Sequence, residues 1–227
     1  MRASVSRDVA IELGQASLAG SLTVPEKARG LVIFAHGSGS GRHSPRNRAV
    51  AKRLNTAAQG TLLLDLLTPS EEAVDRRTAQ LRFDIPLLTE RVRAAVDWAG
   101  RRPEIAALPI GLFGASTGGA AALAAAAHAP TVRALVLRGG RPDLAGGGLA
   151  KVTAPTLMIV GGEDPVVLVL NRQACAQMTT ECRVHVIPGA THLFEEPGAL
   201  EEVSRLAAEW FTQYLPEREE TTTRDPH

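Results

Sequence analysis

The chain has 227 residues, of which 44% are hydrophobic and 22% charged, a composition typical of one globular domain with a sizeable core. Its formal net charge of +1 argues against bulk electrostatic binding to nucleic acid or to an anionic membrane. No apolar run approaches the roughly 18 residues of a membrane span, and the N-terminal segment lacks the apolar core of a signal peptide. We therefore expect a cytoplasmic protein whose partners include neither nucleic acid nor membrane.

Apolar strand-like runs alternate with helical patterns, which favours an α/β fold with a mostly parallel sheet and helices on both faces. The first two strands, 9–13 and 16–24, are predicted to form a hairpin with Gly14 and Gln15 at the turn. Further strands are expected at 30–37, 61–67, 108–114, 133–140, 154–162 and 182–189. Helices are expected at 45–58, 84–101, 116–129, 168–178 and 197–215, and the polar stretch 68–77 is expected to be a loop.

Residues 1–215 are predicted to form a single domain, because no linker or repeat interrupts this pattern. The polar residues 216–227 are expected to be a disordered tail. Only residues 141–153, several of them glycine, separate two neighbouring strands, which leaves no room for a helical lid. A site beside this segment should therefore be open to solvent.

The chain has two cysteines, Cys175 and Cys182, which are too few for a disulfide framework. A free cysteine usually packs as a small hydrophobic residue. We expect both to be reduced, buried thiols in a reducing compartment.

The segment Gly114-Ala115-Ser116-Thr117-Gly118 has the G-x-S-x-G pattern between a buried strand and a helix of small residues. In this context the pattern predicts a nucleophilic serine raised on a strained turn, where side chains at the two glycine positions would collide. The helix that follows points its N-terminus at the serine and favours developing negative charge there. Ser116 is therefore the candidate nucleophile.

An acid and a histidine should follow such a nucleophile in that order. Asp164 lies just past the strand 154–162, and His192 lies in the loop after the last strand. Because sites in open α/β sheets form at the carboxyl ends of the strands, all three residues are expected at one edge. Asp164 would orient the imidazole of His192, and Glu163 is the competing acid.

An oxyanion hole for this nucleophile needs two backbone N–H groups. One should come from Thr117, the residue after the serine. The other should come from the glycine-rich loop 36–41, where Ser38 is our candidate. His36 in the same loop is expected to brace it through hydrogen bonds rather than to act as a base.

Three other interpretations of this region stay open. Ser116 could be a plain helix N-cap. The glycines of 111–118 could form a phosphate-binding loop of a nucleotide-binding enzyme, although such loops normally belong to the first βαβ unit. The whole scaffold could also serve as a non-catalytic binding or signalling module.

Several arginines fall at strand ends or near the expected site loops. They could be ordinary surface charges and salt bridges, with Asp65 and Asp143 as partners. Alternatively they form a rim that recognises an anionic part of the substrate, because guanidinium binds carboxylate and phosphate bidentately. These arginines are Arg42, Arg46, Arg138, Arg141 and Arg172.

The segments "FAHGSGSGRHSPRNR", "DLLTP", "GASTGG", "GGEDPVV" and "PGATHLFEEPGALEE" resemble a bacterial branch of the α/β-hydrolase superfamily, the small lidless proteins grouped with dienelactone hydrolases. The resemblance runs from about residue 8 to 215. It implies hydrolysis of a small carboxylic ester or lactone through an acyl-enzyme. We expect a monomer or small homo-oligomer without a cofactor, and no cluster of Cys, His and Asp predicts a metal site. Dienelactone hydrolases proper use a cysteine nucleophile, whereas this chain has Ser116.

Overall fold

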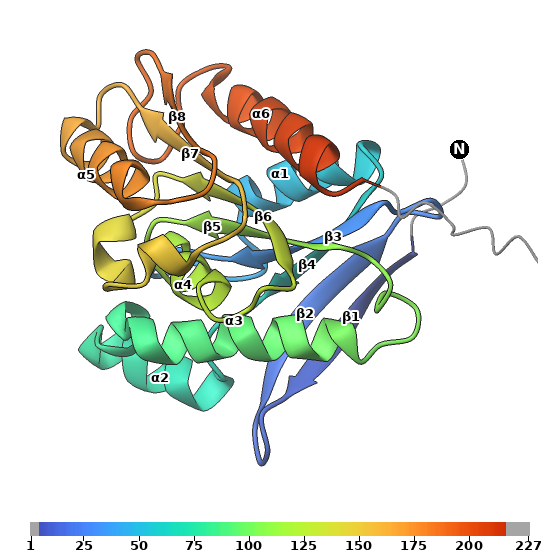
Figure 1. Ribbon diagram of the computed structural model, residues 1–227. Helices are drawn as coiled ribbons and strands as arrows, with labels where there is room; N and C mark the ends of the chain where they lie inside the picture. The colour runs from blue at the N-terminus through green and yellow to red at the C-terminus, as the bar shows by residue number, and fades with distance from the viewer. Residues whose placement is uncertain (1–4, 217–227) are drawn as a thin grey trace, which may run out of the picture.

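Eight strands form one sheet in the order β1-β2-β4-β3-β5-β6-β7-β8 in the computed structural model, which describes residues 5–216 (Figure 1). β1 and β2 pair antiparallel, β2 and β4 pair antiparallel, and every other pair is parallel. The strands are β1 (Val5–Glu12), β2 (Ser17–Val24), β3 (Gly30–Ala35), β4 (Gln59–Leu64), β5 (Ile110–Ala115), β6 (Val132–Arg138), β7 (Thr156–Gly161) and β8 (Cys182–Ile187). The predicted α/β fold, with its mostly parallel sheet and its hairpin at the start, is confirmed.

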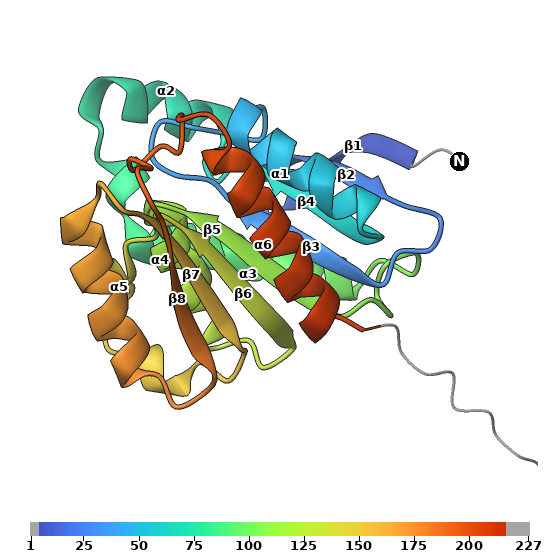
Figure 2. The same ribbon diagram turned by 90° about the horizontal axis from the view of Figure 1, so that it is seen from above.

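Helices cover both faces of this sheet (Figures 1 and 2). One hydrophobic cluster lies between the sheet and α3 (Ile85–Gly100), α4 (Thr117–Ala126) and α5 (Pro165–Gln177). The other lies between the opposite face and α1 (Pro45–Thr56) and α6 (Ala199–Tyr214). The central strands are buried on both faces, which explains why their sequences are continuous apolar runs.

Local signals set the helix starts. Ser44 accepts a hydrogen bond from the N–H of Asn47 and caps α1, with Pro45 in the first turn. Asp164 caps α5 in the same way, so this helix begins three residues before the expected start at 168. Residues 141–153 form two short 3-10 turns, η2 (Pro142–Ala145) and η3 (Leu149–Lys151), and no lid helix, as expected.

One predicted loop is wrong: most of the stretch 68–77 belongs to the helix α2 (Pro69–Thr78). A capping box starts it, in which Thr68 Oγ1 accepts from the N–H of Glu71 and the Glu71 carboxylate accepts from the N–H of Thr68. Ala79 in the left-handed conformation ends it. The sequence of α2 has no apolar residues at helical spacing, because the only residue that the helix buries is Asp75. The helix was therefore missed.

The expectation of two free thiols is also wrong, because Cys175 and Cys182 form a disulfide. Cys175 lies near the end of α5, and the chain turns back at once into β8, where Cys182 is the first residue. This reversal brings the two Cα atoms to 5.5 Å, within the range that a disulfide requires.

Two terminal features need separate mention. The predicted disordered tail lies almost wholly outside the described residues, which end at 216. Among residues 5–216, no helix is both long and apolar enough to cross a bilayer.

Candidate active site

Ser116 lies on a sharp turn between β5 and α4, with φ +50° and ψ −120°. The glycines around it are required by close backbone packing. A Cβ on Gly114 would lie 2.5 Å from Gly119 Cα, and a Cβ on Gly118 would lie 2.2 Å from the carbonyl oxygen of Ala35. The strained turn predicted from the G-x-S-x-G pattern is therefore confirmed, including the reason for its glycines.

The structure joins Ser116, His192 and Asp164 in one chain of hydrogen bonds. His192 Nε2 lies 3.3 Å from Ser116 Oγ, and His192 Nδ1 lies 2.6 Å from Asp164 Oδ2. With Asp164 ionised, Nδ1 is the donor, so Nε2 presents a lone pair to the serine hydroxyl. Ser116 makes no side-chain cap to α4, which argues against the plain N-cap interpretation.

Asp164 is held in place as the N-cap of α5, where its Oδ1 accepts from the N–H of Val167 at 3.4 Å. Its side chain is 15% exposed, whereas the neighbouring Glu163 is exposed. The aspartate rather than the glutamate therefore contacts the imidazole. His192 itself packs against the backbone of Gly139, where an added Cβ would lie 3.2 Å from the ring.

The loop after β3 lies directly against the nucleophile turn. A Cβ on Gly37 would lie 3.2 Å from both the carbonyl oxygen of Ala115 and Cβ of Ser116. The backbone N–H groups of Ser38 and Thr117 have no acceptor within the described part of the chain. Both remain available to a ligand oxygen beside Ser116.

His36 braces this loop, as expected. Its Nε2 accepts from the N–H of Leu66 at 3.0 Å, so Nδ1 carries the proton and donates to the carbonyl oxygen of Gly37 at 2.9 Å. Burial lowers the pKa of His36, and the hydrogen bond to Gly37 only partly opposes this effect. The ring is therefore a neutral structural link between β3 and the segment after β4.

The glycines of 111–118 serve close packing. The missing side chain of Gly111 accommodates the ring of Phe211, 2.6 Å from the Cβ position. At Gly114 and Gly118 neighbouring backbone atoms occupy the space of a side chain, as described above.

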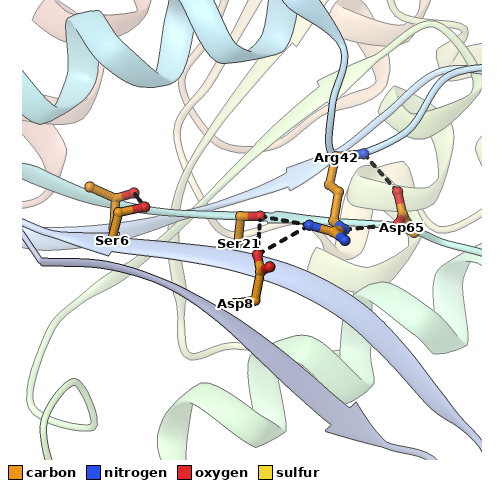
Figure 3. A network of polar contacts seen from close by, with 6 residues as sticks. Ser6, Asp8, Ser21, Arg42 and Asp65 are labelled. Carbon is orange, nitrogen blue, oxygen red and sulfur yellow. Dashed lines mark hydrogen bonds and ion pairs between the residues drawn. The ribbon is translucent and has the colours of Figure 1, made fainter.

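The candidate rim arginines fall into different environments. Arg42 is held by Asp65 and Asp8 through bonds of 3.1 Å, and by Ser21, in a network beside the first hairpin (Figure 3). Arg141 forms a bidentate pair with Asp143, and Arg46 pairs with Glu195. Arg172 is exposed on α5.

Arg138 differs from the other four because it is buried, with 8% of its surface exposed. Its Nη1 has no hydrogen-bond partner among the described residues. Burial, and to a lesser extent the charge of Arg46, lowers the pKa of this guanidinium to about 10. By strand alternation its side chain points toward α1 and α6, under the loop that carries His192.

Sequence reasoning missed a second group of residues at the site, on α2 and the 3-10 turn η1 (Leu81–Phe83). Asp75 is buried and accepts from Arg82 Nε at 2.7 Å and from the N–H of Arg82 at 3.0 Å. Burial alone would raise the pKa of Asp75, but these bonds lower it overall. Arg82 in turn lies beside Gly39 of the loop after β3. The capping box of α2 was the available signal.

A parallel sheet with helices on both faces, and a serine raised at the turn between the fifth strand and its helix, defines the α/β-hydrolase class. The chain belongs to the dienelactone hydrolase family, whose model matches residues 23–216. It is similar to a dienelactone hydrolase from Anabaena variabilis, with 54% identity, a TM-score of 0.91 and coverage of 93% of this chain and 98% of that one. These similarities indicate a hydrolase of the esterase type.

More distant structures share the fold alone. Est1E from Butyrivibrio proteoclasticus is 19% identical with a TM-score of 0.77 over 92% of this chain and 98% of that one. Among curated proteins, "Putative phosphoribosyl transferase Rv0571c" of Mycobacterium tuberculosis is 56% identical over 92% of this chain and 46% of its own length. The chain therefore spans about half the length of the curated relatives it matches.

Proposed function

We propose that the protein is a serine hydrolase that cleaves a small carboxylic ester or lactone through an acyl-enzyme. The observation that carries the proposal is the continuous chain Ser116 Oγ, His192, Asp164, with the serine held at φ +50°. A capping or binding role needs neither the strained serine nor an acid hydrogen-bonded to the histidine. Membership of the dienelactone hydrolase family supports the same conclusion.

In the proposed first step His192 Nε2 takes the proton of Ser116 as its oxygen attacks the ester carbonyl. Asp164 holds the imidazole in the required tautomer and stabilises the imidazolium. The N–H groups of Thr117 and Ser38 stabilise the oxyanion, an effect worth about 3–4 kcal/mol for each donor. The imidazolium then gives its proton to the leaving alcohol oxygen, which leaves Ser116 acylated.

Water completes the reaction. His192 removes a proton from the water that attacks the acyl-enzyme, and Ser116 recovers its hydroxyl proton when the acid leaves. The side chain of His192 is 37% exposed, which gives this water access to the base. No step requires a cofactor.

The test is a Ser116→Ala variant assayed on activated esters and lactones, beside labelling with a fluorophosphonate. Esterase kcat should fall by about 10⁴-fold or more, and the probe should add to the wild type only. Ser204→Ala, which removes a hydroxyl from α6, is the matched control and should keep full activity. A folded Ser116→Ala protein with wild-type activity would refute the nucleophile assignment, and an unlabelled wild type would favour a non-catalytic module.

The name of the curated relatives concerns a protein about twice as long as the matched segment. Because this chain covers only 46% of that length, the name does not define the activity of the matched segment, and the proposal rests on the geometry around Ser116.

We propose a structural role for Arg42, Arg46 and Arg141, because acidic side chains of the protein already occupy their guanidinium groups. A pair of esters of matched size, one acidic and one neutral, tests this proposal. Arg42→Glu should leave KM unchanged for both the acidic and the neutral ester, and a selective rise for the acidic one would restore an anion-binding rim.

A further inference from the structure

Asn171 is a fully buried amide on α5, with 0% of its surface exposed. The other residues that α5 buries, Val167 and Ala174, are apolar. Asn171 Nδ2 donates to the carbonyl oxygen of Gly140 at 2.9 Å and to that of Val167 at 2.7 Å. Because an amide oxygen in this place would face two carbonyl oxygens, the nitrogen must be the atom that lies here. The amide therefore ties α5 to the loop after β6.

The peptide group between Gly140 and Arg141 links this amide to the nucleophile turn. Its carbonyl oxygen accepts from Asn171, and its N–H donates to the carbonyl oxygen of Ser116 at 3.1 Å. A peptide group is planar and rigid, so the bond from Asn171 also sets the direction of this N–H. The N–H of Ser116 donates in turn to the carbonyl oxygen of Arg138 at 3.2 Å. Residues 138–141 thus hold both backbone polar groups of the serine.

The same loop supports the base. The ring of His192 lies against Gly139, where an added Cβ would be 3.2 Å from Cε1 and 3.3 Å from Nδ1. Gly139 directly precedes the residue that accepts from Asn171. A displacement of this loop would therefore move the support of the ring together with the turn of Ser116.

The second bond of Asn171 leads to the acid. The carbonyl oxygen of Val167 accepts from Asn171, and the N–H of Val167 donates to Asp164 Oδ1. One side chain thus joins the first turn of α5, which positions the acid, to the loop that contacts the nucleophile turn and the base.

The carbonyl group of Gly140 depends on this amide. Gly140 is buried, and Asn171 is its donor within residues 5–216. A buried carbonyl oxygen that loses its donor costs free energy, and a glycine offers little resistance to rotation of its peptide group. Without the amide, the 140–141 peptide should rotate toward another donor. Its N–H would then leave the carbonyl oxygen of Ser116.

We propose that Asn171 is a positioning residue of the reaction. It orients the 140–141 peptide group and so holds Ser116 and His192 in register with the acid on α5. This inference rests on the serine hydrolase function proposed above. Because Asn171 is fully buried and cannot touch a substrate, its effect should fall on kcat rather than on KM.

Asn171→Leu tests the proposal, because leucine has a similar size and no donor. The kcat for an activated acetate ester should fall by about 10–100-fold, the loss that a small misplacement of reacting groups produces. KM should stay within about threefold, and the rate of fluorophosphonate labelling should fall in parallel with kcat. A folded Asn171→Leu protein with wild-type kcat would overturn the inference.

Asn55→Leu is the matched control. Asn55 Nδ2 also makes two hydrogen bonds, to the carbonyl oxygen of Gln59 at 2.9 Å and to Thr61 Oγ1 at 3.1 Å. Gln59 begins β4, so this amide lies at the end of the sheet opposite the candidate site. The control should lower the urea midpoint and keep kcat within about twofold. Equal losses of kcat in both variants would indicate general loosening and overturn the positioning role.

Asn171→Asp has the native shape and decides if Asn171→Leu does not fold. An ionised carboxylate cannot donate to Gly140, whereas a neutral carboxyl group can, and burial raises the pKa of such a group. The kcat of this variant, divided by that of the wild type at the same pH, should therefore rise as the pH falls. A ratio that does not change with pH would overturn the inference.

The wild type separates the two proposals. If it shows no Ser116-dependent hydrolysis, the proposed function fails and this inference fails with it. Ser116-dependent hydrolysis that is insensitive to both substitutions of Asn171 overturns the inference only.

Discussion

Buried charged groups have different partners on the two sides of the site, the side of α2 and the side of α5. On the α2 side, Asp75 is fully buried and receives hydrogen bonds from Arg82, and Glu71 pairs with Arg91 at 2.7 Å. The other side, called the α5 side, comprises α5 and the loops after β6, β7 and β8. Here β6 ends at the buried Arg138, whose side chain points toward α1 and α6 and whose Nη1 has no partner among residues 5–216.

Backbone strain and unsatisfied polar atoms occur on both sides. Phe194, two residues after His192, is buried and has φ +55°, a conformation that costs a bulky side chain energy, and Ala79 at the end of α2 has the same φ. Arg91 Nε and Thr117 Oγ1 are buried without a partner among residues 5–216. The difference between the two sides is therefore one of ion pairing: the buried Asp75 has a charged partner, and the buried Arg138 has none.

The largest expected effect is on the acid. Asp164→Asn should lower kcat for an activated acetate ester by about 10⁴-fold, because the amide cannot hold His192 in the tautomer that accepts the serine proton. Steady-state kinetics with a circular-dichroism check of folding measures it.

Glu163→Gln is the matched control. It neutralises the adjacent carboxylate, which is exposed and does not contact His192. Its kcat should stay within about twofold of the wild type. A loss as large as that of Asp164→Asn would reassign the orienting acid.

The next largest effect is expected for a substitution of Arg138, in the free energy of unfolding. The pKa of Arg138 is lowered to about 10 in the folded protein, well below its ordinary value, so the unfolded chain holds this proton more tightly. The charge therefore opposes folding at neutral pH, and this cost decreases as the pH rises above about 10. Arg138→Met should raise the free energy of unfolding at pH 7.5 by about 1–4 kcal/mol, measured in urea.

Arg133 on the same strand provides the comparison, since it is exposed. Arg133→Met should change the free energy of unfolding by less than about 0.5 kcal/mol. If Arg138→Met destabilises the protein instead, the guanidinium has a favourable partner under these conditions, and the contrast between the two sides of the site weakens.

The α5 side was the more predictable of the two from sequence. Asp164 and His192 each follow an apolar strand, and parallel strands bring their carboxyl ends to one edge whatever their order. This prediction does not require knowledge of the strand order β2-β4-β3. Only the fold shows which of Glu163 and Asp164 is the orienting acid, because Asp164 is positioned as the N-cap of α5.

The α2 side could not be predicted in the same way. A helix that buries only Asp75 has no hydrophobic period, so its one signal was the capping box of Thr68 and Glu71. A small cavity on this side is lined in part by Leu67, Arg82 and Leu88. These residues lie far apart in the sequence or belong to different elements, so no sequence pattern indicates the cavity. Whether an arginine finds an acid is likewise decided by packing, as the contrast between Arg42 and Arg138 shows.

The smallest effect concerns the disulfide on the α5 side. Closing the short loop between Cys175 and Cys182, seven residues apart, should stabilise the protein by about 2 kcal/mol, so reduction should lower the free energy of unfolding by that amount. Cys175 lies about 16 Å along the helix from Asp164, so the acid and the base should keep their geometry and the reduced, folded enzyme its kcat. Urea unfolding and esterase kinetics with and without dithiothreitol measure both quantities. In a Cys175→Ala/Cys182→Ala protein, dithiothreitol should change neither the free energy of unfolding nor kcat. A reduced protein that stays folded but loses activity would show that the link tunes the contact between Asp164 and His192, so that the α5 side would depend on it for chemistry as well as for stability.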